Sequence, residues 1–399
     1  MAKVLISFLG TGPADRREYT EAKYKFASNN EYTTPFIAAA IKQEYNIDRI
    51  ILIGTARSMW DCVYDYFGKN NSFDFATWER LYENRICANH TTPIDSIEFQ
   101  QEVERVLGNE SKIVITHYGL NAEEIAKNSE IILNIEELLE ENDRLIVDIT
   151  HSFRSLPMYL MNMLIFLKEV SDKKIKISNI CYGMLDATRE LGYAPVVELN
   201  NLITVNDWIT GAYSFKRFGN ADKIAQLVRS INTNLSERLV SFSDAKNLNY
   251  IKELESQCSN LNQLLEGASD SPLSKRIIIP VVQDFISRLT IDPNSQYPHS
   301  DFQFNLALWQ RNNHYYLAAY TTLTEAIVTR YMEKYGESNL FDRVTRDEVK
   351  KNLDGGYQLY WAVSKTRNAL VHCTDNVNET PQRLIEQLAS FIDRYRKLD

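Results

Sequence analysis

The chain has 399 residues, of which 44% are hydrophobic and 24% charged, and its formal net charge at pH 7 is −9. A length of this order predicts two or three domains, each large enough to bury a core of its own. The acidic balance excludes a general nucleic-acid coat, because Lys and Arg supply the non-specific affinity for phosphate backbones. Any contact with RNA is therefore expected at a local basic cleft, and it is expected to be weak.

The five cysteines, at positions 62, 87, 181, 258 and 373, show neither a CxxC motif nor a paired spacing. Scattered thiols of this kind favour a reducing compartment over disulfides or a zinc site. The first apolar run, residues 4–9, is too short for a signal peptide, and no run of about 18 apolar residues occurs. We therefore expect a soluble, cytoplasmic protein that holds no metal and no other cofactor.

The first 200 residues alternate short apolar runs with helical segments. Strands are expected at residues 4–9, 49–53, 112–116, 144–149, 175–184 and 195–198, and helices near 35–45, 95–107, 121–141 and 155–171. Thr34 followed by Pro35 is typical of a helix start, with a capping Thr and Pro at the first helical position. Apolar strands spaced by helices indicate a mostly parallel sheet covered on both faces. We predict a Rossmann-like parallel-sheet α/β domain over residues 1–200.

After about residue 200 the strand pattern gives way to amphipathic helices, over residues 224–265 and from 277 to the C-terminus. Two sets of apolar residues each repeat at helical spacing, which places each set on one helix face. The sets are Tyr316, Tyr320, Leu323, Ile327 and Tyr331, and Leu384, Leu388, Phe391, Ile392 and Tyr395. Breaks are expected at residues 267–272, 292–299 and 355–356. An all-helical domain therefore follows the α/β domain, joined around residues 200–230.

Loops rich in glycine and polar residues follow three of the predicted strands. They are Gly10, Thr11 and Gly12; Gly54, Thr55, Ala56 and Arg57; and Asp148, Thr150, His151, Ser152, Phe153 and Arg154. In an open parallel sheet, ligands bind at the carboxyl ends of strands where the strand order reverses. Glycines let the backbone approach a phosphate, and the N-terminus of a following helix favours an anion. The loops therefore predict a binding site whose polar side chains hydrogen-bond phosphate, ribose or base.

These loops admit three other interpretations. A nicotinamide dehydrogenase is disfavoured because Pro13 follows Gly12 at once, which is not GxGxxG, and no acidic residue closes the second strand. A hydrolase triad is disfavoured because His151 and Ser152 are adjacent in sequence and do not readily face one another. A structural turn, in which Asp148 and Thr150 cap the next helix, remains open. His117, at a strand end, is expected to be structural.

The helical domain carries an Arg and a His five positions apart, Arg367 and His372, with Asn368 directly after the Arg. This is the pattern of metal-independent RNA-cleaving sites, in which the substrate's own 2′-OH is the nucleophile. Histidine suits proton transfer near neutral pH, and arginine suits bidentate contact with a phosphate. On an ideal helix the two side chains differ by about 140° and ~7.5 Å of rise. They are therefore expected to border a cleft rather than to form one stripe.

A second match to the pattern, Arg85 to His90, lies in what the sequence indicates is an irregular approach to a helix of the first domain. We expect a solvated or structural role for this pair, so context selects the C-terminal match. Asn368 and Lys365 are candidates for holding the phosphate or the histidine in place. The alternative, that they are ordinary surface residues, remains open. His314 is expected to be structural.

Several segments together resemble one known family. They are Leu5 to Gly12, the motif Asp148-x-Thr150-His151-x-Phe153-Arg154, Tyr182-Gly183, the connector Trp208 to Gly219, and the run Arg367 to His372. This order and spacing is similar to the CARF–HEPN ribonucleases of type III CRISPR systems, whose middle motif is usually written DxTHGFR. Ser152 stands in place of the motif's glycine, a small-for-small change that affects how closely the backbone approaches a ligand.

The resemblance implies a CARF ligand-sensing domain at residues 1–200, connector helices at 201–230 and a HEPN ribonuclease domain at 231–399. It implies that the three loops and Tyr182 bind cyclic oligoadenylate, and that a homodimer offers the ring two identical half-sites. Cyclic tetra-adenylate is favoured because two adenylates fall to each subunit, although a hexamer divides equally well.

The resemblance further implies an allosterically activated endoribonuclease of antiviral defence. Arg367, His372 and Asn368 would cut single-stranded RNA by 2′-OH attack, leaving a cyclic or 3′ phosphate, at a site completed across the dimer axis. The alternative is a ligand-responsive transcription regulator whose helical half binds DNA, although the acidic helical half offers no clear basic recognition helix. Slow cleavage of the ring ligand by the sensor domain, through Ser152 or its neighbours, is a further possibility.

Overall fold

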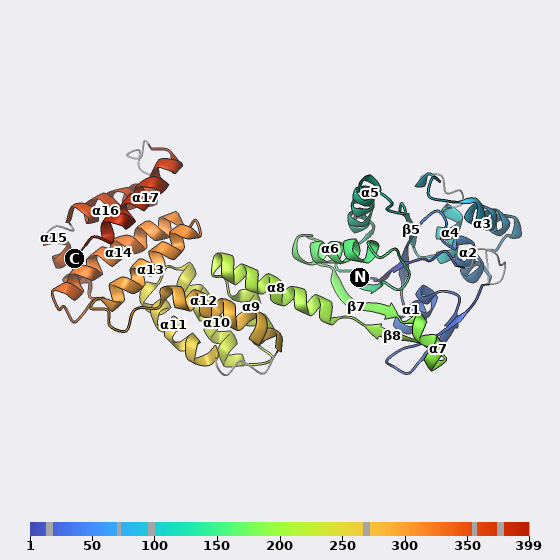
Figure 1. Cartoon of the computed structure of the whole chain (residues 1–399), viewed down its shortest axis with the longest axis horizontal. Coiled ribbons are helices and arrows are strands. Elements are labelled where there is room, and N and C mark those ends of the chain that lie inside the picture. Colours follow the sequence, from blue (N-terminus) through green and yellow to red (C-terminus); the bar gives the residue numbers. More distant parts are fainter. Residues whose placement is uncertain are drawn as a thin grey trace. The chain divides into compact units, whose positions relative to one another are not determined.

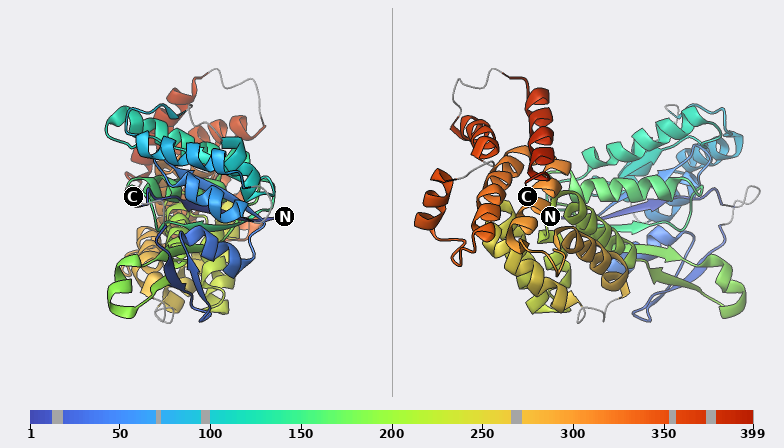
Figure 2. Two further views of the ribbon diagram at one scale, coloured as in Figure 1. Left: turned by 90° about the vertical axis from the view of Figure 1, so that its right-hand side faces the viewer. Right: turned by 60° about the vertical axis from the view of Figure 1, so that its left-hand side comes forward.

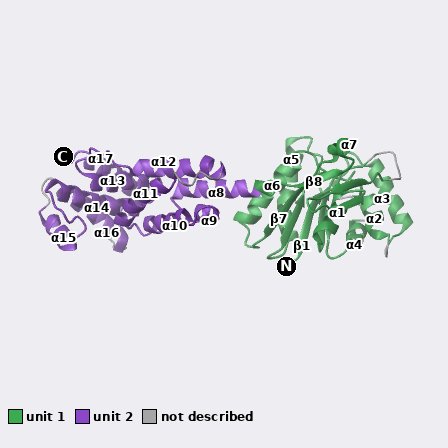
Figure 3. Cartoon of the chain, turned by 90° about the horizontal axis from the view of Figure 1, so that it is seen from below, with its two compact units in different colours: residues 1–202 green, residues 203–399 purple. Residues whose placement is uncertain are grey.

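The computed structural model describes residues 1–12, 19–69, 73–94, 100–265, 272–352, 357–372 and 379–398. Some positions used above lie outside the described residues: Pro13, 95–99, 267–271, 355–356 and Cys373. The chain divides into two compact units, Met1–Leu202 and Ile203–Asp399 (Figures 1 and 3). Among the described helices, none has the length and apolar character needed to cross a bilayer.

The first unit is built on an eight-stranded sheet in the order β3-β2-β8-β7-β6-β1-β4-β5. The strands are β1 (Lys3–Phe8), β2 (Ala22–Lys25), β3 (Glu31–Thr34), β4 (Arg49–Gly54), β5 (Lys112–Ile115), β6 (Arg144–Asp148), β7 (Lys176–Gly183) and β8 (Ala194–Glu198). Strands β5, β4, β1, β6 and β7 run parallel. The Rossmann-like sheet is confirmed, but it is mixed, because β8 runs antiparallel to β7 and β2 to β3.

The strand order reverses at β1, which lies between β4 and β6. The chain places β4 and β5 on one side of β1 and then returns to place β6 and β7 on the other. This is the switch point at which open α/β sheets bind ligands. Every residue of β4 is buried, as is β1 after Lys3, in keeping with their continuous apolar sequences.

Helices cover both faces of the sheet (Figure 2). The helices are α1 (Ile37–Tyr45), α2 (Trp60–Gly68), α3 (Phe75–Cys87), α4 (Gln100–Leu107), α5 (Ala122–Leu133), α6 (Leu156–Glu169) and α7 (Thr188–Leu191), with short 3₁₀ segments η2 (Asn134–Leu138) and η3 (Leu185–Ala187). Leu5, Ile50 and Leu52 share a core with α1 to α4. Ile6 and Ile51, one position along each strand, are buried on the opposite face.

The helix start expected at Thr34-Pro35 is wrong. Thr34 is the last residue of β3, where it pairs with Ala22. Its hydroxyl donates to the carbonyl oxygen of Phe36 at 3.0 Å, so it satisfies a carbonyl and does not cap an N–H group. Helix α1 begins at Ile37, with Phe36 at the N-cap position and no side-chain cap. Thr34 thus belongs to the edge strand β3, whereas the sequence pattern assigned it to the start of the helix.

The described part of the second unit is entirely helical, which confirms the predicted fold class. Its helices are α8 (Asn201–Phe218), α9 (Asp222–Val228), α10 (Thr233–Asn247), α11 (Ile251–Leu265), α12 (Ile279–Leu289), α13 (Pro298–Asn312), α14 (Tyr316–Lys334), α15 (Arg343–Lys351), α16 (Tyr357–His372) and α17 (Pro381–Tyr395), with a π-helical turn η5 (Ser274–Ile278) before α12. One core lies among α8 to α13, and a second lies among α13, α14, α16 and α17. The predicted stripes on α14 and α17 supply Tyr320, Leu323 and Leu388 to the second core.

A buried carboxylate fastens the amino-terminal edge of the sheet. Asp143, just before β6, accepts hydrogen bonds from the backbone N–H of Glu140 at 2.9 Å and of Ala2 at 3.0 Å, and it pairs with the Arg49 guanidinium. Burial alone raises the pKa of Asp143, but the Glu140 and Ala2 amides and the Arg49 charge hold it below its usual range. The carboxylate therefore ties the start of the chain to β4 and β6.

We expect Asp143→Ala to lower the free energy of unfolding by about 3–5 kcal/mol, because it leaves the buried Arg49 charge without its partner. The stabilisation is fully present above the ordinary Asp pKa of about 3.9 and is lost as the pH falls through the lowered pKa of the folded chain. Urea unfolding of the full chain at pH 7 and at about pH 3 measures both effects. Lys127→Ala, which breaks the exposed pair with Glu123, is the control, and an equal loss there would contradict the prediction.

Candidate functional site

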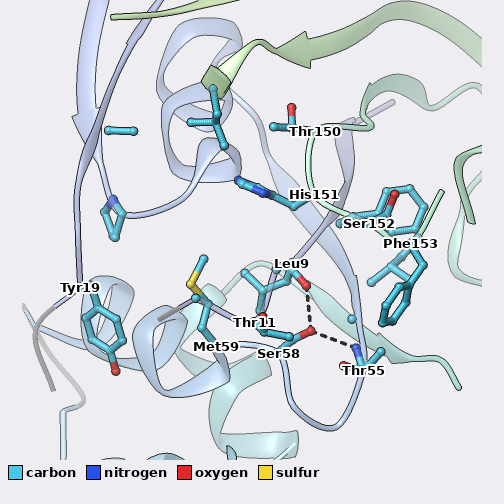
Figure 4. A pocket seen from close by; sticks show the side chains of 18 of the residues that line it. Leu9, Thr11, Tyr19, Thr55, Ser58, Met59, Thr150, His151, Ser152 and Phe153 are labelled. Atoms are coloured by element: carbon cyan, nitrogen blue, oxygen red, sulfur yellow. Dashed lines mark hydrogen bonds between the residues drawn. The ribbon is translucent and has the colours of Figure 1, made fainter. Parts of the chain in front are cut away.

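A cavity of about 600 Å³ opens at the carboxyl ends of β1, β4 and β6, with the segment leading into β2 on its other side (Figure 4). Nine of the predicted ligand residues line this cavity, here called the sensor pocket: Gly10, Thr11, Gly12, Gly54, Thr55, Thr150, His151, Ser152 and Phe153. The structure thus brings together the three loops from separate parts of the sequence. The volume is within the range of about 300–1,000 Å³ that is typical of small-molecule sites.

Five other predicted residues do not line the pocket: Ala56, Arg57, Asp148, Arg154 and Tyr182. Ala56 and Asp148 are buried, and Arg57 is half-buried. Arg154 and Tyr182 are exposed. The pocket lining therefore does not favour direct contact between a ligand in this cavity and these five side chains, and their contact with a ligand stays a prediction.

Ser58 joins two of the pocket loops. Its hydroxyl donates to the Leu9 carbonyl at 2.7 Å and accepts from the Thr55 N–H at 3.0 Å (Figure 4). Glycine is required at position 54 for a related reason: a Cβ there would lie 2.7 Å from both the Ser58 hydroxyl and the Trp60 ring. Close approach by a phosphate is the role expected of Gly54 from the sequence, and the structure shows that Ser58 and Trp60 also leave no room for a side chain there.

Asp148, the last residue of β6, anchors the loop that follows this strand. It is completely buried and accepts hydrogen bonds from the Ser7 hydroxyl at 2.6 Å and from the backbone N–H and hydroxyl of Thr150 at 3.0 and 2.5 Å. The Thr150 hydroxyl in turn accepts from the Gly183 N–H at 2.7 Å. Burial raises the pKa of Asp148, and the Ser7 and Thr150 hydroxyls oppose that rise. Helix capping by Asp148 and Thr150 is wrong, since α6 has Ser155 at its N-cap position.

His151 stands over the loop that follows β1. A Cβ on Gly10 would lie 3.6 Å from the His151 side chain, so the absence of a side chain at Gly10 makes room for the ring. Burial lowers the pKa of His151, and the negative charge of Asp148 opposes this only in part. At neutral pH the ring is therefore uncharged, with one nitrogen available as a donor and the other as an acceptor.

The described lining of the sensor pocket contains Glu21 but neither Lys nor Arg. Binding of an anion would therefore depend on backbone N–H groups, hydroxyls and the imidazole rather than on cationic side chains. Phe153 adds an apolar surface: it is 41% exposed, and its ring centroid lies 5.4 Å from that of Tyr118. Exposed aromatic rings of this kind are platforms on which nucleobases stack.

Sequence reasoning missed part of the lining. Ser58 and Met59 continue the loop that begins at Gly54, so extending that motif would have found them. Tyr19, Thr20 and Glu21 come from the segment before β2. Their sequence shows no strand or motif pattern, and nothing local indicates that the hairpin packs beside the loops of β1 and β6.

Arg85 does not lie in an irregular segment, as the sequence suggested. It occupies the last turn of α3 and is buried. Its guanidinium pairs with Asp61 at 3.0 Å and donates to the Thr11 carbonyl at 3.1 Å. His90 follows α3 in an exposed turn, so the two halves of this second match have different surroundings.

Candidate residues of the second unit lie on α16. Lys365, Asn368 and His372 are exposed and share one helix face with Trp361, at spacings of four, three and four residues. Arg367 lies on another side and is half-buried. Its Nε is buried and hydrogen-bonds to no atom of the described chain. The angular separation expected from the sequence is thus present in the helix.

Other candidates have structural contacts. The backbone N–H and carbonyl of His117 pair with the side chain of Asn128 at 2.8 and 2.9 Å. The His314 ring lies 2.7 Å from the Tyr316 hydroxyl. Within the described ranges, no group of three or more His, Cys, Asp or Glu side chains is arranged to hold a metal ion.

Comparison with known proteins agrees with this geometry. Residues 4–185 match the family model of the CARF domain of the CRISPR system endoribonuclease Csx1. This similarity extends over most of the first unit and supports the CARF part of the sequence-based identification. Residues 204–295 match the second domain of the CRISPR-associated protein MJ1674.

The chain is similar to MJ1674, a CRISPR-associated protein of Methanocaldococcus jannaschii, with 32% identity over 372 residues. The match covers 88% of this chain and 57% of MJ1674, so the chain spans less than two thirds of that relative. Csm6 of Enterococcus italicus, bound to cyclic hexa-2′-fluoro-hexa-dAMP, is similar over 99% of this chain and 93% of its own, with 10% identity and a TM-score of 0.37.

We expect His151 to titrate below the ordinary histidine pKa of about 6.5, because burial disfavours its charged form. The neutral ring therefore stabilises the folded chain at pH values above the ordinary histidine pKa. This stabilisation is lost as the pH falls below that pKa, because the unfolded chain then binds a proton that the folded chain does not. A side-chain NMR titration of the full chain measures the pKa, with the resonance assigned by its disappearance in His151→Gln. Titration above 6.5 would contradict the prediction.

Proposed function

We propose that the chain is a cyclic-oligoadenylate-activated, metal-independent endoribonuclease of type III CRISPR defence. The observation that carries the proposal is the presence, in one chain, of a CARF-domain pocket built from three polar loops and of a separate helix that bears Arg367 and His372. The first unit binds the ring, and the second unit, which we propose to be a HEPN domain, cuts single-stranded RNA.

The sensor pocket suits a nucleotide ring in three respects. Thr55, Ser152 and His151 offer neutral hydrogen-bonding groups to ribose, phosphate and base edges. Phe153 offers a stacking surface to adenine. A two-fold symmetric homodimer supplies a second copy of each group, as a ring with rotational symmetry requires. We favour cyclic tetra-adenylate, with two adenylates to each subunit.

Catalysis is assigned to α16. The 2′-oxygen of the substrate attacks the adjacent phosphorus as its proton is removed, the bond to the 5′-oxygen breaks, and that oxygen takes up a proton, leaving a 2′,3′-cyclic phosphate. His372, exposed at the end of α16, is the proton-transfer group. Arg367 stabilises the phosphate charge, and Asn368 assists in holding it. The exposed face with Trp361 and Lys365 is where we expect a second copy of the chain to complete the site.

Activation requires that the ring bind the cleaving arrangement of the dimer more tightly than the resting one, because a ligand with equal affinity for both shifts nothing. The two sites are distinct, as allostery demands. Ring binding in the first unit therefore supplies the free energy that favours the active arrangement of α16.

The alternative of a DNA-binding regulator has little support on α15, the described helix with the most basic sequence. Its Arg346 is turned inward and pairs with Glu325 at 2.5 Å. Arg343 and Lys350 both lie within reach of Asp347 on the same helix, at 3.9 and 3.1 Å. A recognition helix needs side chains free to reach base edges, which these contacts oppose.

We expect His372→Ala and Arg367→Ala each to reduce RNA cleavage by roughly 10²–10⁴-fold, since each removes a proton-transfer or charge-stabilising group. Cleavage of a labelled single-stranded RNA is measured with cyclic tetra-adenylate, in EDTA. His90→Ala, from the second match to the same pattern, is the matched control and retains activity. Full activity of His372→Ala, or loss of wild-type activity in EDTA, would refute the mechanism.

We expect Phe153→Ala to weaken ring binding by roughly 10-fold or more, because stacking on an aromatic ring contributes about 1–3 kcal/mol per base. Cleavage at saturating ring stays near the wild-type rate, since α16 is unchanged. Calorimetric titration with cyclic tetra- and hexa-adenylate measures the affinity. Phe75→Ala, an exposed phenylalanine outside the pocket, is the control; an equal loss in both variants would exclude stacking on Phe153.

A further inference from the structure

A buried network lies behind the sensor pocket and contacts it at two points. Arg85 of α3 and Asp61 of α2 are 2% and 0% exposed, and the Arg85 Nε lies 3.0 Å from the Asp61 Oδ1. A second guanidinium nitrogen of Arg85 donates to the Thr11 carbonyl at 3.1 Å. Neither Arg85 nor Asp61 lines the pocket, whereas Thr11 does.

The other oxygen of Asp61 extends the network to the opposite wall. The Tyr19 hydroxyl donates to the Asp61 Oδ2 at 2.5 Å, and the Tyr19 ring lines the pocket (Figure 4). Burial and the Asp61 charge raise the pKa of Tyr19, so its hydroxyl keeps the proton that it donates. One ion pair thus fixes a carbonyl after β1 and a phenol before β2, which flank residues 13–18 in the sequence.

The backbone after β1 runs close over this ion pair. Gly12 has a φ of 62°, the left-handed region that favours glycine, and a Cβ there would lie 3.1 Å from the Met59 sulfur and 3.8 Å from an Arg85 guanidinium nitrogen. The Tyr19 ring also lines a second cavity, of about 500 Å³, together with Trp78. Tyr19, like Glu21 and Pro35, lines both cavities, and its hydroxyl is held in place by the hydrogen bond to Asp61.

Burying an ion pair is costly, and an apolar pair of similar volume often serves stability equally well. If the pair served stability alone, its two members would not both need to hydrogen-bond to residues that line the same pocket. Arg85 does so through Thr11, and Asp61 does so through Tyr19.

We propose that Arg85 and Asp61 are positioning residues of the sensor pocket. They hold the Thr11 carbonyl and the Tyr19 ring at the separation that the ligand requires, and they set its affinity without touching it. The identity of the ligand, a cyclic oligoadenylate, rests on the proposed function, whereas the positioning does not. Arg85, which belongs to the second match to the Arg–His pattern and for which the sequence indicates a solvated or structural role, acts in ligand sensing.

The test compares Arg85→Lys with Arg49→Lys in the full chain. Both replace the arginine of a buried Asp–Arg pair by a shorter cation, but Arg49 lies at the amino-terminal edge of the sheet. We expect Arg85→Lys to weaken cyclic tetra-adenylate binding by roughly 10-fold, the loss of a hydrogen bond in a charged network. Arg49→Lys lowers the unfolding temperature but leaves the affinity unchanged. Equal affinities of the two variants would overturn the proposal.

Tyr19→Phe removes only the hydroxyl and tests the second arm. We expect it to weaken binding by several-fold. In the double variant with Arg85→Lys, the fold-loss of affinity is smaller than the product of the two single losses, because both substitutions act through Asp61. Fully multiplicative losses would show that the two residues act independently and would contradict the network.

Hydrogen exchange of the ring-free protein separates this inference from the proposed function. We expect Arg85→Lys, and not Arg49→Lys, to speed amide exchange in residues 9–12 and 19–22. If the wild-type chain binds no cyclic oligoadenylate, the proposed ligand is wrong, and the exchange result alone decides the positioning role. Unchanged exchange in both segments would refute that role.

Discussion

The parallel alignment of β1, β4 and β6 is the constraint from which the first unit's site follows. Parallel neighbours end at the same edge, so loops separated by long stretches of sequence must meet there. Asp148 makes this meeting rigid, because its buried carboxylate joins Ser7 of β1 to the loop after β6. Thr150 extends the connection to Gly183 at the end of β7. The polar atoms that open into the pocket are thus held by strands, not by the loops alone.

The sequence was sufficient where a physical signal was local. The uninterrupted apolar runs of β1 and β4 identify buried parallel strands, and the helical spacing on α14 and α17 identifies core faces. It was insufficient for β2 and β3, whose short segments AKYK and EYTT carry no apolar run. Those strands form because β2 pairs with the free edge of β8, a tertiary contact that the local sequence does not indicate.

The same distinction divides the candidate site. The glycine-containing loops were found because their residue types are unusual at strand ends. The Arg85 contact with Thr11 spans 74 positions, and neither residue's neighbours in sequence indicate it. Gly54 was found from its place at a strand end, whereas the close approach of Ser58 and Trp60 to it could not be anticipated from the sequence. On α16, the helix geometry alone separates Arg367 from His372, so their spacing could be anticipated but their different burial could not.

The burial of Asp148 has a consequence for how such chains evolve. A residue enclosed by Ser7 and Thr150 is constrained by the folding of the loop, whichever molecule the pocket accepts. Phe153, which lines the pocket and is 41% exposed, is not enclosed in this way. Substitutions there can change the preferred ligand while the recognisable motif stays intact. Two chains with the same motif can therefore respond to different signals, and divergence between them is to be sought in the lining.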